Sequence, residues 1–391
     1  MRIIRVLVTL SLVATIVVVS QNPAIAAPKC FGRRATIVGT SGNDHLRGTN
    51  GSDVIAGRGG QDRIEGRGGN DFICGGDNGY GYEGETPLLM GGEGDDHISG
   101  WDGPDSLFGG PGDDLLFGDR GRDGLSGGKG NDVLEGGPGP DSLSGGGEND
   151  VLTGGGGPDG FWPGPGDDRV DGRGGSNSVN YGGNGAVNVD LKSGVATGRG
   201  ADRLANINRV FGSNDNDVIK GTPGFDMLFG GDGGDVVMGR GGNDWLDGGV
   251  SGNDDLFGGA GNDILSGGFG KNNIYGGKGT DAVAFALMYD FEDDQFGGGP
   301  PVTVDLAAGT ARGMNAKDKL FSIENAYGSS RDDTILGDAG ANALFGGPGD
   351  DVVDGRRGND DLDGGDGTDQ LDGGDGTDTC VNGEVLANCE S

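Results

Sequence analysis

A nine-residue repeat dominates this sequence. Residues 127–144, "GGKGNDVLEGGPGPDSLS", contain the same pattern of glycines, one aspartate and one leucine twice. Asp132 and Leu134 return nine residues later as Asp141 and Leu143. Three glycines in every nine residues weaken any helix or strand, because glycine loses the most backbone freedom on folding. The fold of this chain therefore needs a source of stability that offsets the entropy lost by these glycines.

The repeat forms four blocks, and the sixth place of each unit is almost always an aspartate. Asparagine takes that place in three units, at Asn177, Asn272 and Asn342. The sixth-place aspartates are Asp44, Asp53, Asp62 and Asp71 in the first block; Asp96, Asp105, Asp114, Asp123, Asp132, Asp141, Asp150, Asp159 and Asp168 in the second; Asp217, Asp226, Asp235, Asp244, Asp254, Asp263 and Asp281 in the third; and Asp333, Asp351, Asp360, Asp369 and Asp378 in the fourth.

An aliphatic residue follows two positions after the sixth place, as Leu46, Ile55 and Leu116 do. Its neighbours vary freely, which is typical of a three-residue strand with one side chain inward. The preceding residues are glycine, aspartate and asparagine, which favour turns. Turn and strand alternating in one direction predict an all-β fold, a parallel β-roll (a β-solenoid) with two units in each winding.

The glycine content and the net charge limit the kinds of ligand or partner that the chain is expected to bind. Glycine supplies 94 of 391 residues and the net charge is −34. Phosphate binding needs clustered Lys and Arg, so the acidic charge disfavours nucleic acid and anionic membranes as partners and favours cations. One inward aliphatic per unit stabilises less than the ordering of nine residues costs, so bound metal is expected to help. With two histidines and four cysteines in the chain, an all-oxygen site of carboxylates and carbonyls favours calcium.

The units "GGKGNDVLE", "GGPGDDLLF" and "GGAGNDILS" resemble the calcium-binding nonapeptide of the repeats-in-toxin (RTX, haemolysin-type) family of exported bacterial proteins. The resemblance implies calcium between loops of successive windings, held by sixth-place Asp side chains and backbone carbonyls. All the sixth-place aspartates above are then candidate ligands. The three Asn loops are expected to bind weakly, and Pro163 departs from the first-place glycine. If each ion lies between loops two units apart, the blocks offer up to about 20 calcium sites.

The chain ends and the breaks in the repeat set the expected domain boundaries. Residues 1–26 carry Arg2 and Arg5, an apolar run and a small-residue cleavage site, which predicts a signal peptide, no membrane span after its cleavage, and a secreted, extracellular protein. The expected order is then an N-terminal cap at 27–38, a repeat block at 39–74, an insertion loop at 75–90, a block at 91–180, a β insert at 181–211, a block at 212–284, a loop and second β insert at 285–327, a block at 328–381 and a C-terminal cap at 382–391. The two inserts resemble each other, and their alternating apolar residues, such as Val187, Val189 and Leu191, predict strands.

Four cysteines in an exported chain suggest two disulfides, with three possible connectivities. Cys30 precedes the first block and Cys74 lies in its fourth unit, while Cys380 and Cys389 lie at the other end. We predict the pairs Cys30–Cys74 and Cys380–Cys389, each closing one end of the roll.

No catalytic function is expected. The chain contains no His-Glu-x-x-His string, and His45 and His97 both take the outward seventh place of a unit. Two function classes remain open. The first is a calcium-binding structural or interaction protein, whose partner could be another extracellular protein. The second is a calcium-dependent module that binds cell-wall glycan or a cell surface, or the non-catalytic part of an exported enzyme or toxin system.

Overall fold

The computed structural model describes residues 28–77, 87–285, 289–290, 295–296, 300–313 and 317–390. The expected signal peptide and much of the segments 75–90 and 286–301 lie outside the described residues. Every element in the described part of the chain is a β-strand. Within that part, a search for helices long and apolar enough to cross a membrane finds none.

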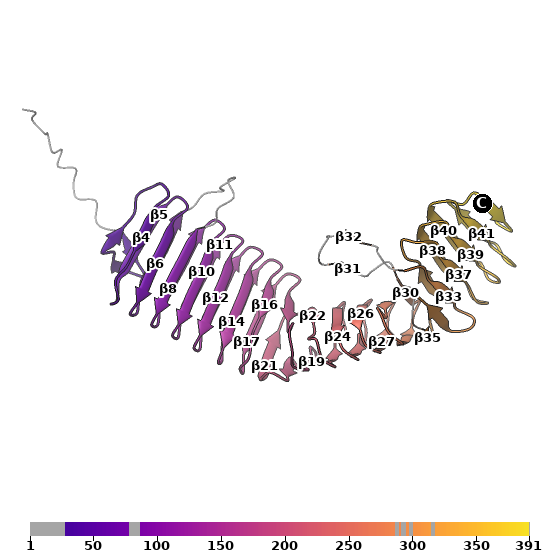
Figure 1. Cartoon of the computed structure of the whole chain (residues 1–391), viewed down its shortest axis with the longest axis horizontal. Coiled ribbons are helices and arrows are strands. Elements are labelled where there is room, and N and C mark those ends of the chain that lie inside the picture. Colours follow the sequence, from indigo (N-terminus) through magenta and orange to yellow (C-terminus); the bar gives the residue numbers. More distant parts are fainter. Residues whose placement is uncertain are drawn as a thin grey trace, which may run out of the picture.

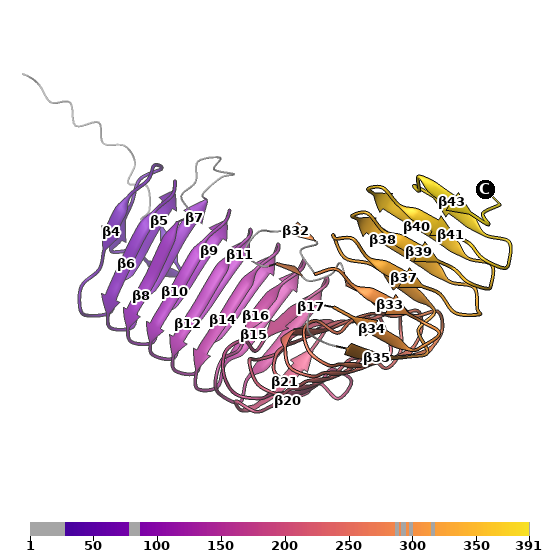
Figure 2. The ribbon, with the colours of Figure 1, turned by 45° about the vertical axis from the view of Figure 1, so that its right-hand side comes forward.

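Two sheets of mostly parallel strands run the length of the molecule and face each other (Figures 1 and 2). The chain alternates between them, so that each winding contributes one strand to either sheet. We call them the long sheet and the short sheet, because they contain 22 and 17 of the described strands.

The long sheet consists of β3 (Ile37–Val38), β5 (Val54–Gly59), β7 (Phe72–Asp77), β9 (His97–Asp102), β11 (Leu115–Arg120), β13 (Val133–Pro138), β15 (Val151–Gly156), β17 (Arg169–Gly174), β19 (Asn188–Asp190), β20 (Val195–Thr197), β21 (Ala201–Ala205), β23 (Val218–Lys220), β25 (Val236–Met238), β27 (Asp255–Ala260), β29 (Asn273–Lys278), β33 (Thr303–Asp305), β34 (Thr310–Arg312), β35 (Lys317–Phe321), β37 (Thr334–Leu336), β39 (Val352–Asp354), β41 (Gln370–Asp372) and β43 (Val385–Ala387).

The short sheet consists of β4 (His45–Arg47), β6 (Arg63–Gly68), β8 (Leu88–Glu93), β10 (Ser106–Pro111), β12 (Gly124–Lys129), β14 (Ser142–Gly147), β16 (Gly160–Trp162), β18 (Ser178–Asn180), β22 (Arg209–Phe211), β24 (Met227–Asp232), β26 (Trp245–Ser251), β28 (Ile264–Ser266), β30 (Ala282–Ala284), β36 (Asn325–Tyr327), β38 (Ala343–Pro348), β40 (Asp361–Asp366) and β42 (Thr379–Val381). Two small antiparallel pairs, β1 (Lys29–Cys30) with β2 (Arg33–Arg34) and β31 (Tyr289–Asp290) with β32 (Gln295–Phe296), lie outside both sheets.

The core is a single file of aliphatic side chains from each sheet. Leu116 pairs in parallel with Leu134, 18 residues on, and Leu125 pairs with Leu143 on the opposite sheet. These side chains are buried, whereas their strand neighbours point outward. The predicted all-β parallel solenoid with two units per winding is therefore confirmed. Many strands are longer than the three residues expected, because they continue through the glycines of the next unit, as in β13.

Two segments differ from their expected roles. The segment 75–90, interpreted as an insertion loop, contributes Leu88 to Met90 to strand β8, which pairs with β6 and β10. Pro87 takes the sixth place of that extended unit, since Leu89 pairs with Ile64 in the core. The expected C-terminal cap contains β43, which adds one more strand to the long sheet.

Each insert adds an antiparallel meander to the long sheet alone. In the first, the spatial order is β17, β21, β20, β19 and β23, with the pairs β21–β20 and β20–β19 antiparallel. The second repeats this order with β29, β35, β34, β33 and β37. On the short sheet, β18 pairs directly with β22, and β30 with β36. Each insert therefore gives the long sheet two strands that the short sheet lacks.

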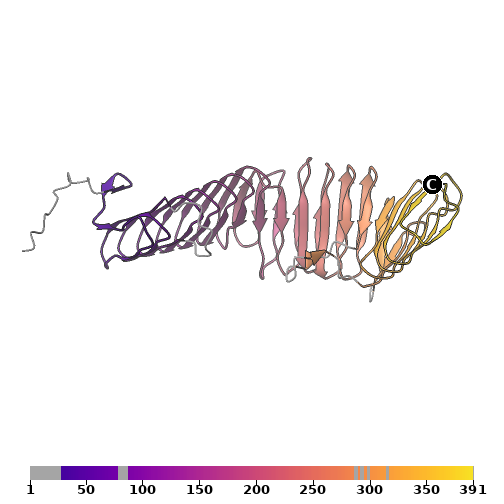
Figure 3. The same ribbon diagram turned by 90° about the horizontal axis from the view of Figure 1, so that it is seen from above.

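The extra strands bend the molecule. Two strands lengthen one wall by roughly 10 Å, about the distance between two packed sheets, so each insert tilts the axis by on the order of 50°. Figure 1 shows the result, an arch whose two end blocks rise on the same side of the middle block, and Figure 3 shows the molecule from above. The short sheet, having fewer strands, lies on the concave side of this arch.

An arginine holds each insert against the following winding. The Arg240 guanidinium donates to both carboxylate oxygens of Asp190, at 2.9 and 2.8 Å, and to the Gly221 carbonyl. Arg356 makes the same three bonds to Asp305 and Gly337. The hydrogen bonds from Arg240 hold the pKa of Asp190 near 2, well below its usual range.

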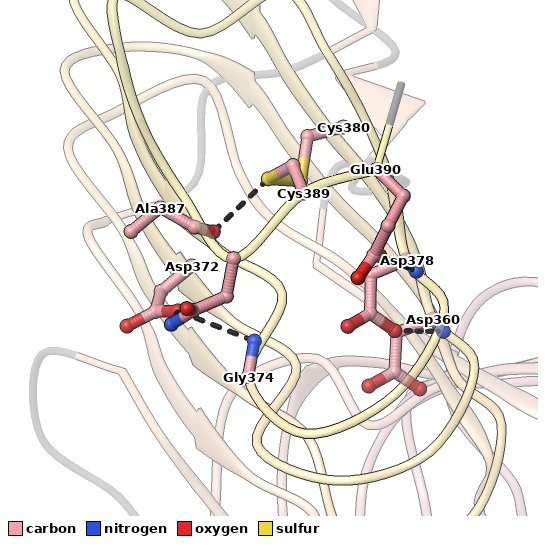
Figure 4. The surroundings of a disulfide bond; sticks show 9 residues. Asp360, Asp372, Gly374, Asp378, Cys380, Ala387, Cys389 and Glu390 are labelled. Atoms are coloured by element: carbon pink, nitrogen blue, oxygen red, sulfur yellow. Dashed lines mark hydrogen bonds between the residues drawn. A yellow bond between two sulfur atoms is a disulfide. The ribbon is translucent and has the colours of Figure 1, made fainter.

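Both predicted disulfides are confirmed. Cys30 is bonded to Cys74 and Cys380 to Cys389, each pair with a Cα–Cα distance of 5.7 Å. The first bond fixes the β1–β2 hairpin to the N-terminal windings. The second closes the last turn, beside the carboxylates of Asp378 and Glu390 (Figure 4).

Candidate metal centre

The sixth-place aspartates form a buried row along each sheet, in which each residue is hydrogen-bonded to the next. We call this row the ladder. Within the described residues, the backbone N–H of one such aspartate donates to Oδ1 of its counterpart one winding later. On the long sheet Asp114 donates to Asp132 and Asp132 to Asp150, each at 2.8 Å. On the short sheet Asp123 donates to Asp141 at 2.9 Å. One carboxylate oxygen of each residue is thus used to join successive windings.

The second carboxylate oxygen, Oδ2, is buried without a hydrogen-bond partner in most units. An unpartnered buried carboxylate oxygen is costly, because buried charges need a counter-charge or a metal. The aspartates with this orphaned Oδ2 are Asp62, Asp71, Asp96, Asp114, Asp123, Asp132, Asp141, Asp150, Asp159, Asp168, Asp235, Asp244, Asp254, Asp263, Asp281, Asp351, Asp360, Asp369 and Asp378. Asp105 belongs to the same ladder, donating to Asp123 at 2.9 Å.

A carbonyl oxygen converges on the same space. A Cβ placed on the first-place Gly248 would lie 2.6 Å from Asp254 Oδ2 and 2.8 Å from the carbonyl oxygen of Gly267, one winding later. The same two kinds of oxygen lie beside many other first-place glycines, such as Gly109 and Gly346. Only glycine leaves this space free of side-chain atoms. The pattern of the repeat thus places a carboxylate oxygen and a backbone carbonyl together at each winding.

Burial raises the pKa of these carboxyls. The pKa of Asp96, Asp114 and Asp123 rises to about 7, and that of Asp62 and Asp132 to about 6, with desolvation as the largest cause. Repulsion between neighbouring windings adds to the effect, as between Asp114 and Asp132. At neutral pH the ladder therefore either takes up protons or needs cations.

The donor set suits calcium. In the part of the chain that the structure describes, no three His, Cys, Asp or Glu side chains come together as a metal-binding group. A metal here would take one carboxylate oxygen per loop and the rest of its ligands from backbone carbonyls. Calcium accepts such all-oxygen sets in flexible geometry, whereas zinc prefers nitrogen and sulfur. The residues present fit calcium.

Five of the 25 candidate aspartates differ from the rest. Asp44, Asp53, Asp217, Asp226 and Asp333 each accept hydrogen bonds from a threonine or serine in the second place of their own loop. The Asn at 177 and 272 continues the ladder, accepting from Asp159 and Asp254 through Oδ1. Pro163, which replaces a first-place glycine, does not interrupt it, since Asp150 donates to Asp168 at 2.8 Å.

Sequence reasoning missed five acidic residues that continue the ladder. Asp202 and Asp318, inside the inserts, accept from Asp168 and Asn272 at 3.1 and 2.9 Å. Glu324, Glu384 and Glu390 accept the backbone N–H groups of Asp281, Asp369 and Asp378. The Asp-x-Leu spacing of "DRL" and "DKL" could have found the two aspartates. Glu324 and Glu384 also stand two positions before an apolar residue, Ala326 and Leu386, but a search for aspartate in the sixth place passes over them.

Comparisons with known proteins identify the family of this chain. No curated protein matches it. Among solved structures, one match is a hyperactive, Ca²⁺-dependent, β-helical antifreeze protein from an Antarctic bacterium, with 19% sequence identity over 83% of this chain and 84% of that chain, and a TM-score of 0.26. The family model of the RTX calcium-binding nonapeptide repeat (4 copies) matches residues 36–77, 89–125, 126–161, 211–246, 248–283, 327–362 and 348–380. These matches cover more than half of the sequence and contain most of the windings that carry the aspartate ladder, so the chain belongs to the RTX calcium-binding nonapeptide repeat family.

Proposed function

We propose that this calcium-binding β-solenoid is exported, folds on calcium outside the cell, and acts there as a structural or interaction protein. The observation that carries the proposal is the ladder of buried aspartates, in which 19 residues have a carboxylate oxygen, Oδ2, that no protein group satisfies. Bound calcium would supply the positive charge that these oxygens lack. The proposed calcium ligands are the Oδ2 atoms of the ladder and the first-place carbonyls beside them.

Two further features support the proposed location outside the cell. Two disulfides are typical of oxidising environments such as the cell exterior. Residues 1–26 have the composition of a secretory signal peptide. Extracellular calcium modules bind with dissociation constants of about 0.1 to 1 mM, which lets calcium outside the cell control folding.

A calcium titration tests the proposal. Purified protein stripped of metal is expected to lose most of its far-ultraviolet circular dichroism signal for β-structure and to regain it cooperatively at millimolar calcium. Magnesium serves as the control, because it demands a rigid octahedral shell that these loops do not offer. A β-signal that is unchanged in protein verified to be metal-free would overturn the proposal. N-terminal sequencing of the secreted protein tests export, with a mature chain starting near Ala27 expected.

We propose no catalytic role. His45 is exposed and contacts Glu65, and His97 stacks on Phe72. Burial lowers the pKa of His97. The hydrogen-bond partners of His45 are Glu65 and Arg47, and Nδ1 of His97 is buried without a partner. Hydrolysis of protein, lipid or glycan substrates by the purified chain, abolished by one point substitution, would contradict this.

One groove favours glycan binding as a second candidate function. Phe31, Trp101 and Phe117 line it together with Asp102, Asp119 and Arg120. Trp101 is half exposed, and its φ of 81° is costly for a residue that is not glycine. Aromatic faces beside a few polar groups suit a sugar ring. A glycan array probed with calcium-loaded protein and with the Trp101→Ala variant tests this candidate, which requires a signal that the variant loses.

A further inference from the structure

The loops of this solenoid fall into two classes, which differ at the second place of the unit. In most loops this place is a glycine or a residue with positive φ, such as Gly231 (φ 111°) or Arg240 (φ 79°). We call these glycine loops. In six loops the second place has an ordinary negative-side φ and a side chain that bonds to the sixth-place residue. These six, which we call capped loops, have Thr40, Thr49, Ser213, Thr222, Ser329 and Asp338 in the second place.

In the three capped loops with threonine, the carboxylate oxygen that is orphaned elsewhere has two donors. In the loop of Thr222, the backbone N–H and Oγ1 both donate to Asp226 Oδ2, with Oγ1 at 2.9 Å. Oγ1 also accepts the Gly224 N–H at 3.0 Å, which orients the hydroxyl hydrogen toward the carboxylate. The oxygen left without a partner in Asp226 is the other one, Oδ1.

The other two threonine loops repeat this arrangement, and the remaining three capped loops vary it. Thr40 and Thr49 each donate their hydroxyl to Oδ2 of Asp44 and Asp53 at 2.9 Å. Ser213 and Ser329 donate their N–H to Oδ2 and their hydroxyl to Oδ1 of Asp217 and Asp333. In the sixth loop the partners are exchanged, since Asp338 accepts from the side-chain amide of Asn342 and donates its N–H to it. None of the capped aspartates has an orphaned Oδ2 among the described residues.

The capped loops occupy one kind of position in the fold. Two of them start the solenoid, two follow the first insert and two follow the second. In each pair, one loop leads to the long sheet and the other to the short sheet. They are therefore the first full winding of each straight section of the arch.

We propose that the capped loops take no calcium, and that each section of the solenoid begins with a winding held by protein hydrogen bonds alone. This inference rests on the proposed calcium function and assigns the ions to the glycine loops. In a glycine loop Oδ2 is open to a cation. In the three threonine loops two hydrogens already lie against Oδ2. In the two serine loops one hydrogen lies against each carboxylate oxygen. A cation would have to displace these hydrogens and would face their positive ends.

Two matched variants test the assignment in the full-length mature protein. The first changes the capped aspartates Asp44, Asp53, Asp217, Asp226 and Asp333 to Asn. The second changes Asp62, Asp71, Asp235, Asp244 and Asp351 to Asn, which lie one winding later on the same sheets. Native mass spectrometry at saturating calcium counts the bound ions. The first variant is expected to keep the wild-type number, and the second to lose about five.

Equal losses in the two variants would overturn this inference alone, whereas wild-type protein that binds no calcium would overturn the proposed function and this inference with it. If either variant fails to fold, crystals of the unaltered protein soaked with terbium decide the question by anomalous diffraction. Peaks are then expected beside the aspartates of the glycine loops. A peak within coordinating distance of any of the five capped carboxylates would refute the assignment.

Discussion

The change of Gly145 to Ala is expected to destabilise the solenoid and remove one calcium ion. Gly145 is the first-place glycine of the loop that carries Asp150, and its φ lies outside the left-handed region. Any effect of a methyl group there is therefore steric. An added Cβ would lie 2.6 Å from the carbonyl oxygen of Pro163 and in contact with Asp150 Oδ2. The methyl group would occupy the space proposed for the ion.

Gly147, two residues further along the same loop, provides the control. A Cβ at Gly147 would meet no atom within 4 Å, and its φ is also outside the left-handed region. The overpacking expected in the Gly145→Ala variant costs about 1–3 kcal/mol. Replacing an unstrained glycine by alanine instead stabilises by about 0.4–1 kcal/mol through the unfolded state. The two variants should therefore differ by roughly 1.5–4 kcal/mol, a factor of ten or more in the unfolding equilibrium.

Urea unfolding followed by circular dichroism at saturating calcium measures the difference, and native mass spectrometry counts the ions. Gly145→Ala is expected to unfold at lower urea and to hold one ion fewer, while Gly147→Ala matches or exceeds the wild type in both. Equal midpoints and equal ion counts for the two variants would refute the reasoning that the first-place glycine reserves space for the metal.

Three further predictions follow from the ladder, the inserts and the C-terminal disulfide. In chelator, acidification from pH 8 to pH 5 should increase β-structure, because burial raises the folded-state pKa of Asp114 and Asp123 to about 7. The stability of the metal-free protein is therefore greatest at low pH and is lost as the pH rises through that value. A circular dichroism signal that does not change over this range would contradict the prediction. Arg240→Met should lower the unfolding free energy by about 1–3 kcal/mol, because the Asp190 carboxylate loses both hydrogen bonds from the guanidinium and keeps only backbone donors such as the Ser193 N–H. An Arg240→Met variant that is as stable as the Arg240→Lys variant would show that the bidentate pair is unimportant. Changing Cys380 and Cys389 together to Ser should increase amide hydrogen exchange in β43 while leaving β11 unchanged, which mass spectrometry of peptides can resolve.

The sequence alone determined the class of fold and the family. A strict nine-residue period with one inward aliphatic leaves few alternatives to a winding of short parallel strands, because only a repeating structure gives every unit the same environment. The pairings of the four cysteines could also be predicted, since each pair lies at one end of the repeat. The aspartates that form the ladder were identified for the same reason, as each marks the sixth place of a unit.

The sequence did not reveal how the inserts act. Their strands were expected. The antiparallel order of β19, β20 and β21 on one sheet alone depends on which strands pair with each other, and only the tertiary structure determines that pairing. The resulting bend follows from the unequal number of strands in the two walls. The ladder's extension through Asp202 and Glu324 was hidden for a similar reason, because these residues reach their positions by pairing across an insert.

The division of the loops was also decided by the tertiary structure. In the sequence, Thr222 in the second place is one departure among many from a glycine, like Arg240 or Trp101. Backbone conformation separates them. Arg240 and Trp101 keep the positive φ of the glycine loop, and the Arg240 side chain bonds to Asp190 and Gly221. Thr222 leaves that region and donates its hydroxyl to Asp226. The sequence therefore specifies which residues can offer oxygen to a cation, and the three-dimensional path of each loop decides which of those oxygens remains available.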